Sequence, residues 1–184
     1  MIERIESPHG VVAIATGNET PRELGRIALR AALGELGCVA GEIANDERGA
    51  PIVPAGFVGS ISHKRGRAAA LAARDDGARV GVDLERAVAP RQPIERRVLT
   101  ARELAALGDR TTVTLAFAIK EAIYKAVDPF VRRYVAFGEV ELAIGGHGAC
   151  GVHAVEPSRL PAAIDAWWCE RDGYWLATAR ARAG

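Results

Sequence analysis

Hydrophobic and polar positions along the first ninety residues follow a pattern of one helix and several short strands. Apolar side chains recur at helical spacing after Thr20, which forms a capping box with Glu23, so a helix is predicted from Pro21 to about Gly37. Short apolar runs predict strands, and Asp75-Asp76-Gly77 predicts a hairpin turn between the last two of them. The predicted strands are Val11–Thr16, Val58–Ser62, Arg67–Arg74 and Ala78–Leu84.

A similar order of elements returns in the second half of the chain. A capping box at Thr100 and Glu103 begins a short helix, and a longer helix is predicted from about Thr112 to Val127. The repetition predicts an α+β fold of two similar halves related by a pseudo-twofold axis, each with a long helix packed on a small antiparallel sheet. The halves are expected to be residues 1–90 and 91–184. The strands predicted in the second half are Phe137–Ile144, Ala149–Glu156, Ala163–Glu170 and Tyr174–Ala181.

Composition narrows the functional class. The 24 basic and 23 acidic residues give a formal net charge of +1, which does not support a nucleic-acid-binding surface. Apolar runs are too short to cross a bilayer, and the charged segment Met1–Gly10 is unlike a secretory signal. The three cysteines are spaced too widely for a disulfide framework or a zinc site. We therefore expect a cytoplasmic protein that binds neither nucleic acid nor a membrane.

Two acidic residues lie two positions apart in the segment Gly81-Val82-Asp83-Leu84-Glu85. On a strand, Asp83 and Glu85 would share one face while Val82 and Leu84 face the core. Carboxylates that converge in this way repel one another unless a cation lies between them, and oxygen ligands select a hard ion such as Mg²⁺. A strand end that carries two solvated acids is the alternative, and the pentapeptide alone leaves it open.

The predicted helix around residues 115–126 is apolar on nearly every side, which is typical of a buried helix. Lys120, Glu121 and Lys125 interrupt it, and Glu121 and Lys125 are spaced to share one face. A surface ion pair is the alternative, but a buried charge needs a partner or a ligand. Only three of the 24 basic residues are lysines, and two of the three lie here, which favours a site that needs ammonium groups.

A third polar cluster lies at the end of a predicted strand. Alternation places Ser60 and Ser62 on one face, and His63 follows directly. Hydroxyl, imidazole and backbone N–H groups at a strand end suit phosphate binding, with the capping of a turn as the alternative. Together, the three clusters indicate chemistry on a phosphate ester or anhydride, in which positioning and charge neutralisation dominate.

These same residues carry a resemblance to a known family. The segments 59–63, 81–85 and 117–126 resemble the three ordered motifs of the 4′-phosphopantetheinyl transferases, and the pairing of Gly-x-Asp-x-Glu with Lys-Glu-x-x-x-Lys is specific to that superfamily. The resemblance covers roughly residues 20–145. It is closest to the monomeric two-halved type, in particular the siderophore branch (enterobactin synthetase component D-like).

The resemblance implies an activity and its residues. A serine of an apo acyl- or peptidyl-carrier protein would receive the 4′-phosphopantetheine arm of coenzyme A, and 3′,5′-ADP would leave. Mg²⁺ would be held by Asp83, Glu85 and Glu121, with Glu121 also accepting the serine proton and Lys125 neutralising the leaving phosphate. The implied coenzyme A-binding residues are Arg26, Arg48, Ser62, His63, Lys120 and Lys125. The carrier protein would dock near the early helices of the second half, at Val98, Leu99 and Leu104.

Two other functions stay open at the level of the sequence. A non-catalytic relative would bind coenzyme A or a carrier protein without turnover. A Mg²⁺-dependent phosphohydrolase would instead cleave coenzyme A or a nucleotide without any carrier protein.

Overall fold

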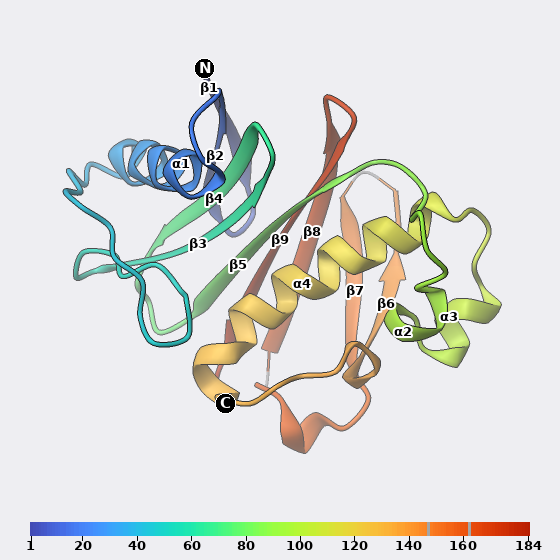
Figure 1. Ribbon diagram of the computed structural model, residues 1–184. Helices are drawn as coiled ribbons and strands as arrows, with labels where there is room; N and C mark the ends of the chain where they lie inside the picture. The colour runs from blue at the N-terminus through green and yellow to red at the C-terminus, as the bar shows by residue number, and fades with distance from the viewer. Residues whose placement is uncertain (147, 162) are drawn as a thin grey trace.

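The computed structural model describes residues 1–146, 148–161 and 163–184, and its first elements form one antiparallel sheet covered by a helix (Figure 1). The sheet has four strands in the order β1-β2-β4-β3, and α1 packs across it. The predicted capping box at Thr20 and Glu23 is confirmed. The bounds of these elements are β1 Ile2–Ser7, β2 Gly10–Thr16, α1 Pro21–Glu35, β3 Phe57–Lys64 and β4 Arg67–Arg74.

The second sheet has five strands in the order β5-β9-β8-β7-β6 and is covered by the long helix α4. Helix α4 is apolar nearly all round because it contacts this sheet on one side and the short helices α2 and α3 on another. The bounds are β5 Arg79–Arg86, α2 Glu95–Val98, α3 Ala101–Ala105, α4 Thr111–Val131, β6 Val140–Ile144, β7 Ala149–Ala154, β8 Ala163–Arg171 and β9 Tyr174–Arg182, with 3₁₀ helices at Phe137–Glu139 and Pro157–Arg159.

The predicted α+β class, with a long helix on each of two antiparallel sheets, is confirmed. The predicted hairpin between β4 and β5 is wrong. Strand β4 already pairs with β2 on one edge and β3 on the other, so neither edge is free for β5. The chain instead crosses after Asp75-Asp76-Gly77 into the second sheet, where β5 pairs with β9 along its whole length. Strand β1, which the sequence did not predict, pairs with β2 at the edge of the first sheet.

Strand β5 lies against α4 at very short range, and one glycine allows this approach. A Cβ atom at Gly81 would lie 1.9 Å from the carbonyl oxygen of Ala122 on α4. Any side chain there would push the strand away from the helix, because the obstacle is backbone. Gly81 therefore sets the distance between the strand that carries Asp83 and the helix that carries Glu121.

Strand β5 lies within the range 1–90 expected for the first half, but it belongs to the second sheet. Each sheet with its helices is one half of the structure, and the two halves meet where β3 and β5 run side by side (Figure 1). At this junction, two serine side chains of β3 bond the backbone of β5, in the place where neighbouring strands would ordinarily bond backbone to backbone. The hydroxyl oxygen of Ser60 accepts the N–H of Val82 at 3.2 Å, and that of Ser62 accepts the N–H of Leu84 at 3.3 Å. Apolar side chains from both sheets form a shared core beneath them, so the halves are one packed unit. None of the described helices combines the length and apolar character needed to cross a membrane.

A buried histidine also lies between the halves. His9, in the β1–β2 turn, is 5% exposed, and its Nδ1 lies 2.8 Å from the hydroxyl oxygen of Thr178 on β9. Burial lowers the pKa of His9 below 6.5; the charge of Asp165 opposes this shift and that of Arg180 adds to it. The unfolded chain therefore binds more protons than the folded one below that pH. The stability that His9 contributes is present above pH 6.5 and is lost as the pH falls through its folded-state pKa.

We therefore expect the stability advantage of the wild type over His9→Gln to shrink on acidification from about pH 7.5 to about pH 5.5. Urea unfolding of both proteins at the two pH values measures this difference. His153→Gln is the matched control, since His153 is exposed on β7. A difference between wild type and His9→Gln that stays constant with pH would contradict the expectation.

Candidate functional site

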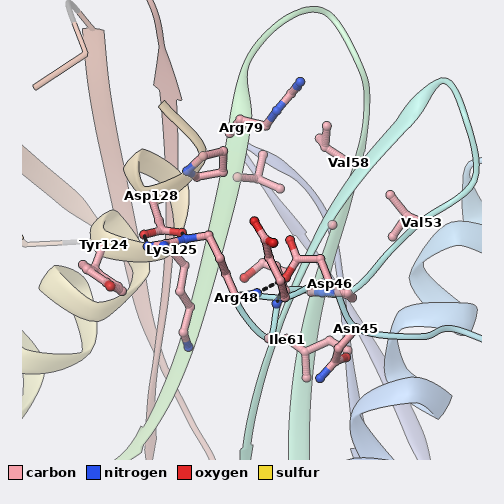
Figure 2. A pocket seen from close by; sticks show the side chains of 18 of the residues that line it. Asn45, Asp46, Arg48, Val53, Val58, Ile61, Arg79, Tyr124, Lys125 and Asp128 are labelled. Atoms are coloured by element: carbon pink, nitrogen blue, oxygen red, sulfur yellow. Dashed lines mark hydrogen bonds and ion pairs between the residues drawn. The ribbon is translucent and has the colours of Figure 1, made fainter. Parts of the chain in front are cut away.

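A cleft with a volume of about 1010 Å³ lies between the two halves (Figure 2). The first half contributes α1, β3 and the loop of residues 45–51, and the second contributes the polar side of α4. Five of the residues implicated by the sequence line it: Arg26, Arg48, His63, Glu121 and Lys125. The structure therefore brings together side chains that lie almost a hundred positions apart in the chain.

The wall contributed by the first half carries two arginines on α1, beside the acidic Asp46, Glu47 and Asp75 of the same wall. Arg22 and Arg26 lie four residues apart on α1, and neither forms an ion pair within the described parts of the chain. Arg26 is held in place by neutral groups: its Nε donates to the carbonyl oxygen of Ile43 at 3.2 Å, and its Nη2 donates to the side chain of Asn45. Guanidinium groups held in this way, with His63 nearby on β3, are suited to binding phosphate oxygens.

A buried carboxylate lies at the bottom of the junction between the halves. Asp83 on β5 is 5% exposed, and its Oδ1 accepts hydrogen bonds from the Ser62 hydroxyl at 2.7 Å and from Lys125 Nζ at 2.8 Å. Lys125 also donates to the carbonyl oxygen of Val82 at 2.8 Å. The second carboxylate oxygen, Oδ2, is buried and has no hydrogen-bond partner among the residues that the structure describes. A buried anionic oxygen without a partner is costly, so this atom suits a cation.

Two further carboxylates carry charges that interact with Asp83. Glu85 Oε1 forms an ion pair with Lys64 Nζ at 2.5 Å. Burial is the main cause that raises the pKa of Glu85; the Lys64 hydrogen bond opposes the rise and the charge of Asp83 adds to it. Burial also raises the pKa of Glu121, and the charge of Asp83 is the next largest cause. The three acids therefore repel one another, which a divalent cation would relieve.

The donor set fits a hard cation by its chemistry, since all its atoms are carboxylate oxygens and Asp83 Oδ2 bonds none of the described residues. Across the described ranges, no three acidic, histidine or cysteine side chains are already gathered at the spacing of metal ligands. Lys64 and Lys125 instead pair with Glu85 and Asp83. A cation at this site would replace part of the positive charge that the two ammonium groups supply.

Two of the expected coenzyme-binding residues do not reach the cleft. Ser62 is 7% exposed and faces β5, where it bonds Asp83 and the N–H of Leu84. Lys120 is 2% exposed, and its ammonium donates to Glu103 at 2.7 Å and to the carbonyl oxygens of Val98 and Phe137 at 2.9 and 3.0 Å. The expectation that these side chains contact the coenzyme is corrected. Neighbouring residues on a helix point about 100° apart, so Lys120 is directed into the core while Glu121 faces the cleft.

Two of the three expected docking residues are also corrected. Val98 is 1% exposed and Leu99 is 8% exposed, because both pack under α4 in one apolar cluster. Leu104 packs against the same cluster. Val98 and Leu99 are therefore not available to contact a carrier protein. Leu104 is only half-buried, so its docking role stays a prediction.

The structure adds residues that the sequence analysis did not single out. Tyr124 and Asp128 on α4 line the cleft, as does Arg132 directly after the end of α4. Asp128 follows Glu121 by seven residues and Lys125 by three, so helical periodicity alone places it on the same face. That spacing is the signal that could have identified it. A smaller apolar cavity of about 300 Å³, lined partly by Phe117 and Phe137, adjoins the cleft at Glu121 and Tyr124.

Comparison with known families agrees with this geometry. A family model described as the 4′-phosphopantetheinyl transferase N-terminal domain matches residues 23–73. A second model, described as the 4′-phosphopantetheinyl transferase superfamily, matches residues 79–179, which is more than half of the chain. The chain belongs to the 4′-phosphopantetheinyl transferase superfamily. The two matched ranges divide where the chain crosses from β4 to β5.

Two 4′-phosphopantetheinyl transferases and one enterobactin synthase component are similar to this chain. The transferase Svp of Streptomyces mobaraensis is 39% identical over 131 residues, which is 65% of this chain and 52% of that protein. Npt of Nocardia iowensis is 40% identical over 126 residues, covering 64% and 55%. Enterobactin synthase component D of Salmonella typhi is 38% identical over 112 residues, covering 55% and 45%, in agreement with the siderophore branch. The chain spans about half the length of these relatives.

Proposed function

We propose that this chain transfers the 4′-phosphopantetheine arm of coenzyme A to a serine of an apo acyl- or peptidyl-carrier protein and releases 3′,5′-ADP. One observation carries the proposal: Glu121 and Lys125 face the cleft directly beside the buried Asp83, whose Oδ2 has no partner within the described part of the chain. Family membership supports the same assignment.

Coenzyme A is proposed to bind across the cleft with its phosphates toward the first half. Arg26, Arg48 and His63 line that wall and would contact phosphate oxygens. The apolar cavity beside Glu121 and Tyr124 would accept part of the pantetheine arm, since its lining suits a chain that carries methyl groups. The β-phosphorus would then lie between that wall and α4.

Asp83, Glu85 and Glu121 are the residues that would hold Mg²⁺, and the bound ion would neutralise charge on the pyrophosphate. Ser62 would act as a positioning residue in this arrangement. Its hydroxyl bonds Asp83 Oδ1 at 2.7 Å, which leaves Oδ2 directed elsewhere.

Glu121 is proposed to accept the proton of the incoming serine. Burial and the neighbouring Asp83 raise the pKa of Glu121, so the carboxylate is a stronger base than a solvated glutamate. The serine oxygen forms a bond to the β-phosphorus, and the bond from that phosphorus to the bridging oxygen breaks. The electron pair leaves with 3′,5′-ADP, and the ammonium of Lys125 stabilises the charge that develops there.

The proposed enzyme is expected to act as a monomer in the cytoplasm. Both walls of the cleft come from one chain, so no second copy is needed to complete it. Size-exclusion chromatography with light scattering tests the oligomeric state. A dimer with residues of the partner in the cleft would contradict the expectation.

The test of the function is a transfer assay. Purified protein, coenzyme A, Mg²⁺ and a panel of apo carrier proteins should yield a carrier whose mass has increased by one phosphopantetheine, together with 3′,5′-ADP. Replacing the acceptor serine of the carrier by alanine should prevent the increase. Coenzyme A binding without transfer to any carrier would favour a binding protein, and hydrolysis of coenzyme A without a carrier would favour a phosphohydrolase. Either result would overturn the proposal.

A further inference from the structure

Two reciprocal ion pairs join the loop of residues 45–51 to the end of α4 across the cleft. Arg48 donates from Nε to Asp128 Oδ2 at 2.7 Å and from Nη2 to Asp128 Oδ1, and Figure 2 shows its side chain reaching from the loop to Asp128. In the opposite sense, Arg132 Nη2 donates to Glu47 Oε1 at 2.6 Å. Each element thus supplies one cation and one anion, and the partners are 80 and 85 positions apart in the chain.

The tip of this loop is a rigid turn with little apolar support. Asp46 Oδ1 accepts the backbone N–H groups of Arg48 and Ala50, both at 2.9 Å. Residues 44–50 are all exposed, whereas Ile43 just before them is buried. The direction of the Arg48 guanidinium therefore depends on Asp128 rather than on packing.

Asp128 accepts two hydrogen bonds from Nε and Nη2 of the Arg48 guanidinium, which lines the proposed coenzyme site. Carboxylate and phosphate groups accept the same two parallel N–H bonds from arginine, so a ligand phosphate and Asp128 cannot both hold Arg48 in this way. The hydrogen bond to Asp128 raises the pKa of Arg48 above its usual value, which reflects how well the pair is matched. A phosphodiester carries one negative charge, so its attraction to Arg48 is little stronger than that of the carboxylate that it displaces. A phosphomonoester dianion carries twice that charge and attracts Arg48 more strongly.

We infer that Asp128 competes with the phosphomonoester of the ligand for Arg48. The inference rests on the proposed function. Coenzyme A must displace Asp128 to bind its phosphomonoester at Arg48, and 3′,5′-ADP, which carries the same group, is held less tightly for the same reason. Asp128 therefore limits the retention of the product and favours its release after transfer.

Isothermal titration calorimetry with coenzyme A, dephospho-coenzyme A and 3′,5′-ADP tests the exchange. Dephospho-coenzyme A lacks only the phosphomonoester, so it should leave the Arg48–Asp128 pair intact. Asp128→Asn should bind coenzyme A and 3′,5′-ADP about fivefold more tightly than the wild type, while its affinity for dephospho-coenzyme A should stay within about twofold. Asp128→Ala should show the same selectivity.

Glu47→Gln is the matched control. It removes one negative charge from the same cleft and one ion pair from the same loop, yet leaves Arg48 and Asp128 paired. Its affinities for all three ligands should stay within about twofold of the wild type. If Glu47→Gln raised the affinity for coenzyme A and 3′,5′-ADP as much as Asp128→Asn does, the loss of charge or the mobility of the loop would explain the tighter binding. That result would overturn the inference.

Two other outcomes would also overturn it. Asp128→Asn could bind coenzyme A no more tightly than the wild type does. Alternatively, its affinity for dephospho-coenzyme A could rise as much as its affinity for coenzyme A. If the wild type binds coenzyme A and modifies carriers in either case, the inference alone fails. If the wild type binds none of the three ligands, the proposed function and the inference both fail.

Discussion

Replacing Glu121 by glutamine is expected to lower the rate of phosphopantetheine transfer by about 10²- to 10⁴-fold, the usual contribution of a general base. The amide keeps the shape of the side chain but cannot accept the serine proton, and it offers a weaker ligand to a cation. No fall in thermal stability is expected, because the substitution removes a half-buried charge that is repelled by Asp83. Mass spectrometry of the carrier measures the rate, and a thermal melt checks the fold.

Glu35→Gln is the control for this experiment. Glu35 lies at the end of α1 in an exposed ion pair with Arg4, so the same chemical change there should leave the transfer rate unaltered. A Glu121→Gln variant that transfers at the wild-type rate would remove Glu121 from the mechanism. The role of base would then have to be assigned to another group in the cleft.

Replacing Lys120 by methionine is expected to cost about 3 kcal/mol of unfolding free energy, because it breaks a buried ion pair. The ammonium of Lys120 binds Glu103 and two backbone carbonyls, and it thereby ties α4 to α2, α3 and the segment at Phe137. Methionine fills the volume but leaves the carboxylate of Glu103, which is 7% exposed, without its cation. Chemical denaturation of wild type and variant measures the loss.

Two companion variants identify the cause. Lys64→Met removes an ammonium whose side chain is 40% exposed, so it should cost less than about 1 kcal/mol. Adding Glu103→Gln to Lys120→Met should recover part of the loss, since the uncompensated charge disappears. A Lys120→Met protein that is as stable as the wild type but has lost its affinity for coenzyme A would contradict the structural role and restore the ligand contact.

Local sequence was sufficient for most of the elements, though not for β1 or α2, and for part of the site. The capping boxes at Thr20 and Thr100 were predicted correctly, because each depends on side chains only three residues apart. The same holds for the pairing of Glu121 with Lys125 on one helical face. His63 was indicated by the polar cluster at the end of its strand, whereas Arg26 and Arg48 were placed at the cleft by resemblance to a family rather than by any local pattern.

Other expectations failed where the outcome depended on contacts between distant segments. The turn at Asp75-Asp76-Gly77 reverses the chain, but the edges of β4 were already occupied, so the turn did not create a hairpin. From the sequence, Ser62 could equally have faced a ligand or a neighbouring strand. Only the packing of β5 against β3 shows that it faces the strand.

By itself, the sequence determined most of the helical and extended segments and which residue types are available for chemistry, because those properties arise from interactions over a few residues. The tertiary structure decided which side of α4 meets the core and which meets the cleft, and so separated the structural Lys120 from Glu121. It also decided that Arg48 meets Asp128, 80 positions away. Burial and ion pairing between distant residues follow from how the two halves pack, and no local pattern encodes that.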